Sequence, residues 1–190
     1  MRALLGWGFV TAGAVGEANP YPDPMARRPA PIPPGPGQES VWDYPRPPRV
    51  EEFAGSIEIH LGGRRIARTD RAHRVLETSH PPTYYLPRDA FEPGVLRPTE
   101  GATWCEWKGR ASYFDVVAGD AVAPRAAWTY ETPTPGFEAI AGAVAVMARA
   151  MDRCTVNGEV VTPQPGGFYG GWVTSTVVGP FKGEPRTMGW

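Results

Sequence analysis

One stretch of this 190-residue chain, residues 75–117, contains most of the side chains that could carry out acid–base, nucleophilic or ligand-binding chemistry. These side chains are a carboxylate, a histidine, a thiol, an amine and three phenols: Glu77, His80, Cys105, Lys108, Tyr84, Tyr85 and Tyr113. Ligand sites typically combine apolar and aromatic walls with a few polar groups. The stretch is therefore the first place to look for a site.

Glu77 and Lys108 are the candidates for acid–base chemistry. Glu77 lies among apolar residues in VLET, and a buried carboxylate must be paired, for which Lys108 is a plausible partner. Such a pair in a pocket could act as general acid and base, and a purely structural ion pair is an equally good explanation. Trp104, Trp107 and Tyr113 flank Lys108, which indicates an anion site with apolar walls or, alternatively, a solvated strand end.

Cys105 is the candidate nucleophile. Strand alternation in TWCEWK places Cys105 and Trp107 on one face and Lys108 on the other. A nearby cation favours the thiolate form of a cysteine. Because Lys108 is expected on the opposite face of the strand, it is a weak candidate for that cation. An inert, buried thiol is the better-supported interpretation.

Tyr85, Trp128 and His80 complete the candidate ligand-binding set of Glu77, His80, Tyr85, Lys108, Tyr113 and Trp128. Tyr84 and Tyr85 are adjacent and must point to opposite faces of a strand. Trp128 shares a strand face with Tyr130, so the two predict an aromatic wall, although core packing is the default for each ring. His80 borders a proline-stiffened segment, where an exposed loop histidine is the expected alternative.

Composition argues against several classes of partner. A net charge of −1 gives no general attraction to nucleic acid or to an anionic membrane. Histidines and cysteines show no metal-ligand spacing, so we expect no metal and no cofactor. Cys105 and Cys154 are best explained as free thiols in a reducing compartment, the cytoplasm. Export through the signal-like residues 1–18 is the alternative.

The chain contains 23 glycines and 23 prolines, which favours turns and strands over long helices. We expect a mainly β fold, a rolled sheet or partly open β-barrel of short antiparallel strands, with at most one short helix. Gly62-Gly63 and Asn157-Gly158 predict hairpin turns. Residues 137–152 are the one candidate helix, and their glycine and valines leave a strand open.

Three regions are expected along the chain. Residues 1–48 are a proline-rich N-terminal extension, whose true start could be Met25. Residues 49–162 form the β-rich domain, and residues 163–190 form a tail rich in glycine and aromatic residues that packs on it.

Several ordered motifs resemble the domain-of-unknown-function family 427. They are VWDYPRPPRVE, VLETSHPPTYYLPR, TWCEWKGRASYFDV, AAWTYETPTPGFEAIAG and PQPGGFYGGWVTSTVVGPFKG. The resemblance covers residues 41–190 and implies a small, mainly β, single-domain protein. The family pattern falls on Glu77, Pro82, Tyr85, Thr103, Cys105, Lys108, Gly109, Tyr113, Trp128 and Tyr130, and the chain departs from it at MARAMD.

The family carries a nucleotidyltransferase-like label that the residues do not support. Nucleotidyl transfer needs clustered carboxylates to hold Mg²⁺ against a triphosphate, and the sequence has no DxD pattern. We instead expect an unknown small molecule to bind in a pocket walled by Tyr85, Tyr113 and Trp128, with enzymatic activity left open. The alternative is a structural module that forms a homodimer through its arm and tail; a thiol enzyme built on Cys105 is the third hypothesis.

Overall fold

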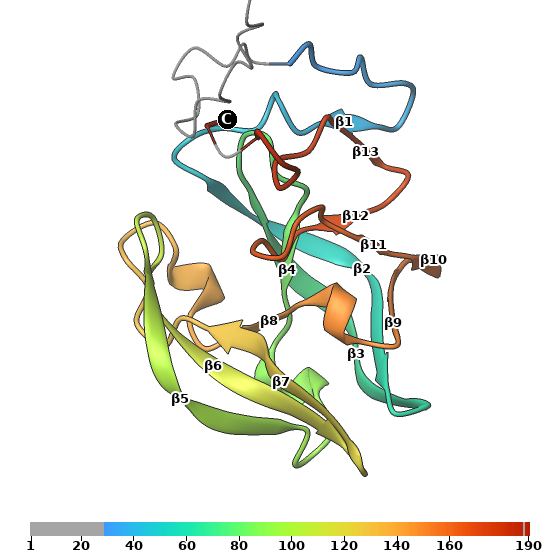
Figure 1. Ribbon diagram of the computed structural model, residues 1–190, viewed down its shortest axis with the longest axis vertical. Coiled ribbons are helices and arrows are strands. Elements are labelled where there is room, and N and C mark those ends of the chain that lie inside the picture. The colour runs from blue at the N-terminus through green and yellow to red at the C-terminus, as the bar shows by residue number, and fades with distance from the viewer. Residues whose placement is uncertain (1–28, 188) are drawn as a thin grey trace, which may run out of the picture.

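The computed structural model describes residues 29–187 and 189–190 (Figure 1). The expectations about Met25 and a signal-like N-terminus therefore lie outside the described residues. Within them, the secondary structure consists of strands and three short 3₁₀ turns. In chain order these are β1 (Glu39–Ser40), β2 (Arg49–Leu61), β3 (Arg64–Leu76), β4 (Thr83–Tyr85), η1 (Arg88–Ala90), β5 (Leu96–Cys105), β6 (Gly109–Ala118), β7 (Ala121–Thr129), η2 (Glu138–Ile140), β8 (Val144–Val146), η3 (Ala148–Ala150), β9 (Arg153–Val156), β10 (Glu159–Val160), β11 (Thr162–Pro163), β12 (Trp172–Val173) and β13 (Val177–Val178).

Two antiparallel sheets form the body of the protein. One has the strand order β10-β9-β2-β3-β4 and the other has the order β5-β6-β7-β8. Leu86 and Val144 exchange two backbone hydrogen bonds of 2.9 and 2.8 Å, which join the β4 edge of the first sheet to the β8 edge of the second. Neither sheet closes on itself. The expected mainly β fold of antiparallel strands is confirmed.

The predicted hairpin turns lie where the sequence places them. Gly62 and Gly63 join β2 to β3, and Asn157 and Gly158 join β9 to β10. All four residues have positive φ values, between 51° and 81°. Two successive residues with positive φ give a tight turn whose twist matches that of the flanking strands, and glycine and asparagine tolerate this conformation best.

Residues 137–152 form no α-helix. They fold as η2, the strand β8 and η3, with Gly142 at a φ of 69° between the first two. Val144 and Val146 are fully buried because β8 lies between β7 and the Leu86 segment. Among the described residues, no helix is long and apolar enough to cross a membrane.

The main apolar core lies between the two sheets. It includes Ile57, Ile59 and Leu86 from the first sheet and its edge, and Val116 and Val144 from the second. A second cluster lies around Tyr85, Trp128 and Tyr130. The two adjacent tyrosines are thus separated as alternation predicts, because Tyr84 belongs to the main core and Tyr85 to the second cluster.

The proline-rich arm and the C-terminal tail pack on each other and on the first sheet. β1 pairs in parallel with β13, and the Trp42 indole N–H donates to the main-chain oxygen of Pro180 at 2.9 Å. Arg74 of β3 binds Glu39 of the arm at 2.9 Å. Trp172 of the tail is only 1% exposed and belongs to the main core, so the tail contributes to the interior of the protein.

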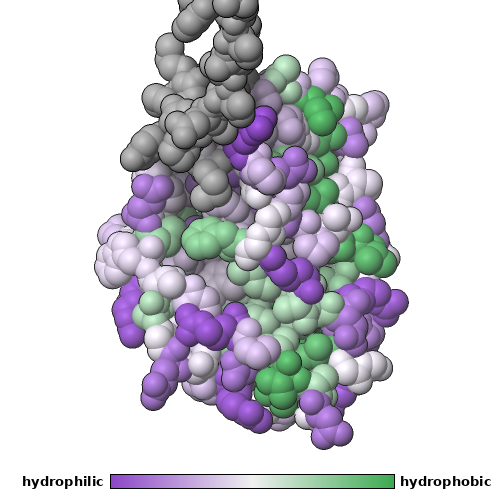
Figure 2. Space-filling view, in the orientation of Figure 1, coloured by the Kyte–Doolittle hydropathy of each residue, from purple (hydrophilic) through white to green (hydrophobic). Residues whose placement is uncertain are grey.

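The surface shown in Figure 2 mixes charged and apolar side chains. The large apolar side chains exposed among the described residues are Ile32, Trp104, Val122, Val160 and Phe168. Two of these, Trp104 and Phe168, border the candidate site.

Candidate functional site

A cavity of about 530 Å³, here called the aromatic cavity, brings the sequence-predicted residues together. Its walls come from the segment around β4, the β5–β6 hairpin, β7 and the C-terminal tail. The seven residues predicted as catalytic or ligand-binding candidates all line it: Glu77, His80, Tyr85, Cys105, Lys108, Tyr113 and Trp128. Side chains up to about 50 positions apart in the chain therefore share one hollow.

Aromatic rings dominate the walls of this cavity. The rings are Tyr85, Trp104, Trp107, Tyr113, Trp128, Tyr130, Phe168 and Tyr169. Trp128 donates its indole N–H to the Tyr85 hydroxyl at 3.3 Å, and the two rings meet edge to face at 6.4 Å. Tyr130 lies 6.3 Å from Tyr85, measured between ring centroids. Edge-to-face and tilted contacts of this kind stabilise aromatic clusters beyond the area they bury.

The buried phenols of Tyr85 and Tyr130, here called the inner wall of the cavity, are uncharged at neutral pH. Burial raises the pKa of Tyr130 far above its usual range, and the neighbouring Tyr85 and Cys105 raise it further. Burial likewise raises the pKa of Tyr85. The charges of the cavity therefore come from its amines, guanidinium group and carboxylates, and the tyrosines contribute neutral hydroxyl groups.

Two rings at the border of the cavity face solvent. Trp104 is 74% exposed and Phe168 is 76% exposed. Trp104 belongs to β5 and Phe168 to the loop between β11 and β12. A large exposed ring gains little from the core, so exposed rings that line a cavity are suited to contact a bound molecule.

The expectation that Cys105 and Lys108 face opposite ways is wrong. β5 ends at Cys105, and the chain reverses through Glu106, Trp107 and Lys108 before β6 begins at Gly109. Strand alternation does not apply within a turn, and Cys105 and Lys108 both line the cavity. Gly109 has a φ of 88°, a conformation that favours glycine at the end of this turn.

Glu77 is paired, but not with Lys108. Its carboxylate lies 3.3 Å from the Arg46 guanidinium, a residue of the proline-rich arm. The Lys108 ammonium instead lies 5.9 Å from the centroid of the Tyr130 ring. Sequence reasoning missed Arg46 as the partner because the contact depends on how the arm folds back onto the sheet.

His80 is buried, not exposed as expected for a loop histidine. It is 8% exposed, and its ring meets that of Tyr169 edge to face at 4.6 Å. Its Nδ1–H donates to the carbonyl of Thr78 at 2.9 Å, so the neutral ring carries its lone pair on Nε2. Burial lowers the His80 pKa, although Glu77 opposes this shift.

The two thiols have different environments. Cys105 is half-buried at the cavity wall, whereas Cys154 is buried in the main core. Burial raises the Cys154 pKa to about 12, which makes that thiol a poor nucleophile at neutral pH. Both cysteines are free.

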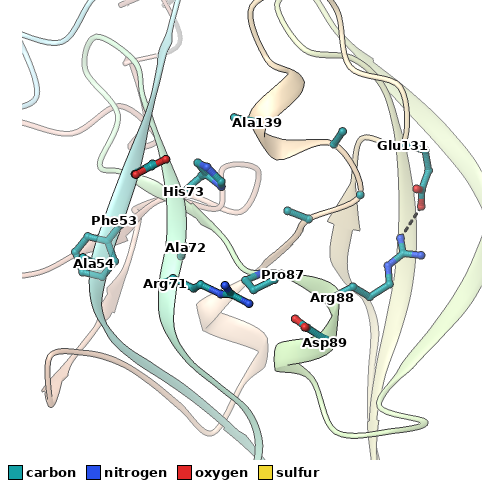
Figure 3. A pocket seen from close by; sticks show the side chains of 14 residues that line it. Phe53, Ala54, Arg71, Ala72, His73, Pro87, Arg88, Asp89, Glu131 and Ala139 are labelled. Atoms are coloured by element: carbon teal, nitrogen blue, oxygen red, sulfur yellow. Dashed lines mark hydrogen bonds and ion pairs between the residues drawn. The ribbon is translucent and has the colours of Figure 1, made fainter.

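A larger cavity, of about 800 Å³, lies elsewhere between the sheets. Figure 3 shows Phe53, Arg71 and His73 on one side of it and Arg88 and Glu131 on the other. Arg88 and Glu131 pair with each other at 2.5 Å, and much of the remaining lining is alanine, glycine and proline. None of the predicted site residues lines it.

Several residues of the aromatic cavity were missed from the sequence, among them Arg46, Phe168, Tyr169 and Lys182. The last three come from the tail, whose GGFYGGW segment has no phosphate-binding pattern and indicated only packing. Lys182 could have been noticed because the chain contains only two lysines.

In the described part of the chain, no group of three or more His, Cys, Asp or Glu side chains could hold a metal ion.

Comparison with known proteins identifies the family of this chain and does not identify an activity. No curated protein matches the chain significantly. A family model described as "Domain of unknown function (DUF427)" matches residues 49–157, which is more than half of the chain and runs from the start of β2 to the β9–β10 turn. The chain belongs to the DUF427 family.

Proposed function

We propose that this protein binds a small molecule in the aromatic cavity. The observation that supports this most is that the two exposed rings, Trp104 and Phe168, border a hollow walled by six further rings. A volume of about 530 Å³ lies within the range typical of ligand pockets. Flat apolar groups fit such walls because they can stack on the rings and exchange water for aromatic contact.

The polar groups of the cavity would orient the ligand. Lys108 and the Glu77–Arg46 pair supply charge, and the Tyr113 hydroxyl, hydrogen-bonded to Thr103 at 2.7 Å, supplies a donor or acceptor. Glu77, Cys105 and Lys108 are candidates for chemistry on the ligand. Binding, rather than a particular reaction, is the function proposed.

The test uses a neutral bicyclic probe, 2-naphthamide, and removes only exposed rings. We expect the wild-type protein to bind the probe, and Trp104→Ala/Phe168→Ala to bind it at least tenfold more weakly, measured by titration calorimetry. The matched control is Ile32→Ala/Val160→Ala, which removes two exposed apolar side chains that do not line the cavity. Equal affinity in all three proteins, or failure of the wild type to bind both 2-naphthamide and the corresponding acid, 2-naphthoate, would refute the proposal.

The alternative is a homodimer formed through the arm and tail. It has less support, because the arm and tail already bind each other within one chain through β1, β13 and Trp42. Sizing the full chain beside a version that lacks residues 163–190 tests it, although removal of Trp172 also damages the core. The folded full-length chain is therefore the reference in this experiment. If the full-length chain is a monomer, the homodimer hypothesis fails.

A cytoplasmic location is also proposed. It is supported by the two free cysteines, because reducing compartments keep thiols unpaired.

A further inference from the structure

The distribution of lysine in the chain points to the aromatic cavity. The chain has 19 lysines and arginines together, and only Lys108 and Lys182 are lysines. Both line this one cavity, although they are 74 positions apart and come from different elements, the β5–β6 turn and the C-terminal tail. Elsewhere the chain uses arginine for every positive side chain.

Lysine and arginine would act differently in a hollow walled by rings. A guanidinium group is flat, stacks on aromatic faces and would occupy the space between them. An ammonium group is a compact charge at the end of a thin stem and leaves that space open. The one arginine of the cavity, Arg46, is already paired with Glu77.

The two lysines have different contacts. The Lys182 ammonium donates to the main-chain oxygen of Trp190 at 2.8 Å, and its carbonyl accepts from the Gln164 side chain at 2.8 Å. Its main-chain N–H donates to Ser79 at 2.8 Å. These bonds hold the tail against the cavity, so Lys182 has a clear structural role.

Lys108 has no comparable partner. Within residues 29–187 and 189–190 it makes no side-chain hydrogen bond and no ion pair, and its ammonium lies over the face of Tyr130 at 5.9 Å. Burial also leaves the Trp107 indole N–H without an acceptor among the same residues. The turn thus places two donors without acceptors, Trp107 and Lys108, on the cavity wall, beside the carboxylate of Glu106, which also lines the cavity.

We propose that the ligand of the aromatic cavity is an anionic, flat molecule, whose carboxylate or phosphate group binds the Lys108 ammonium while its apolar part lies among the rings. This inference rests on the proposed function and adds the chemical class of the ligand. A carboxylate or phosphate gives Lys108 the charge-assisted hydrogen bonds that it lacks within the described chain. The half-buried position makes this interaction stronger than it would be on an open surface.

The test compares two probes of nearly the same shape, 2-naphthoate and 2-naphthamide, which differ in charge. We expect the wild-type protein to bind the acid at least tenfold more tightly than the amide. Lys108→Met should abolish this preference, weakening the acid at least tenfold and leaving the amide within twofold. Raising the salt concentration should weaken binding of the acid by the wild type. Inorganic phosphate, as a competitor, shows whether the anion group is recognised without the rings.

Arg97→Met is the matched control, because it removes one positive charge from the same hairpin at an exposed position outside the cavity. It should keep the preference for the acid. Wild-type protein that binds both probes equally would overturn the anion inference and leave the proposed function standing, whereas failure to bind either probe would overturn both. Loss of the preference in Arg97→Met would show a general charge effect and also overturn the assignment to Lys108.

Discussion

Of the two cavities described above, the smaller one has more of the features that are typical of a ligand site. The larger one, of about 800 Å³, is lined mainly by small side chains and by charged groups such as Arg88 and Glu131, which pair with each other. The aromatic cavity, of about 530 Å³, has eight rings and an ammonium group, Lys108, with no acceptor among the described residues. The Arg71 guanidinium of the larger cavity also has no acceptor among the described residues, so it is the rings that distinguish the two cavities. Ligand pockets are lined mainly by apolar and aromatic side chains with a few placed polar groups, and the smaller cavity is therefore the better candidate.

The comparison also shows that the aromatic cavity is built from two kinds of ring. Tyr85 and Trp128 are buried and belong to an apolar cluster, whereas Trp104 and Phe168 are exposed. The first kind must serve stability whether or not a ligand binds. The second kind is free to serve binding alone.

The largest effect is expected from removing a buried ring. Tyr85→Ala should lower the free energy of unfolding by about 3–5 kcal/mol, because the fully buried ring leaves a void and takes away the acceptor of the Trp128 N–H. Tyr85→Phe keeps the ring and should cost about 1 kcal/mol. Chemical unfolding measures both. A cost below 1 kcal/mol for Tyr85→Ala would mean that the inner wall is not part of the core.

A smaller loss of folding stability is expected when the pH is lowered. Burial lowers the His80 pKa, so the unfolded chain binds a proton at a higher pH than the folded protein does. The stability that the neutral ring contributes is complete above the ordinary histidine pKa and is lost as the pH falls below it. Thermal unfolding between pH 7.5 and 5 should show this loss.

His80→Gln is the variant that isolates the effect. It should flatten the pH dependence over that range while Glu77, Arg46 and Lys182, the charged neighbours of His80, remain. An unchanged slope would show that other groups carry the acid sensitivity and that the His80 ring accepts a proton in the folded protein.

The smallest effect is expected at the larger cavity. Arg88→Ala breaks an ion pair whose two side chains are both about half exposed, and such pairs contribute less than about 1 kcal/mol. It should leave the affinity for 2-naphthamide unchanged. If titration instead shows that the variant loses affinity, the binding site belongs to the larger cavity.

Much of the fold could be predicted because its signals are local. Alternation in SIEIHL and the Gly62-Gly63 and Asn157-Gly158 pairs predict strands and turns without reference to distant residues. Residues 137–152 were ambiguous because short apolar runs suit a helix or a strand, and the pairing of β8 with β7 decided the outcome.

The sequence predicted several residues that line the aromatic cavity, but it did not predict their contacts. Residue types and their aromatic neighbours were enough to select Glu77, Tyr85, Lys108 and Trp128, which all line one cavity. The pairing of Glu77 with Arg46, and the burial of His80 against Tyr169, depend on where the arm and tail return to the sheet. No local pattern encodes those returns.

By itself, the sequence determined that this chain forms antiparallel strands and that one stretch is rich in reactive side chains, because turn chemistry and strand alternation act between neighbours in the chain. Only the tertiary structure decided which charges pair, which rings are buried and which lysine finds no acceptor among the described residues. Those outcomes depend on contacts between the arm, the two sheets and the tail, and such contacts exist only once the chain has folded.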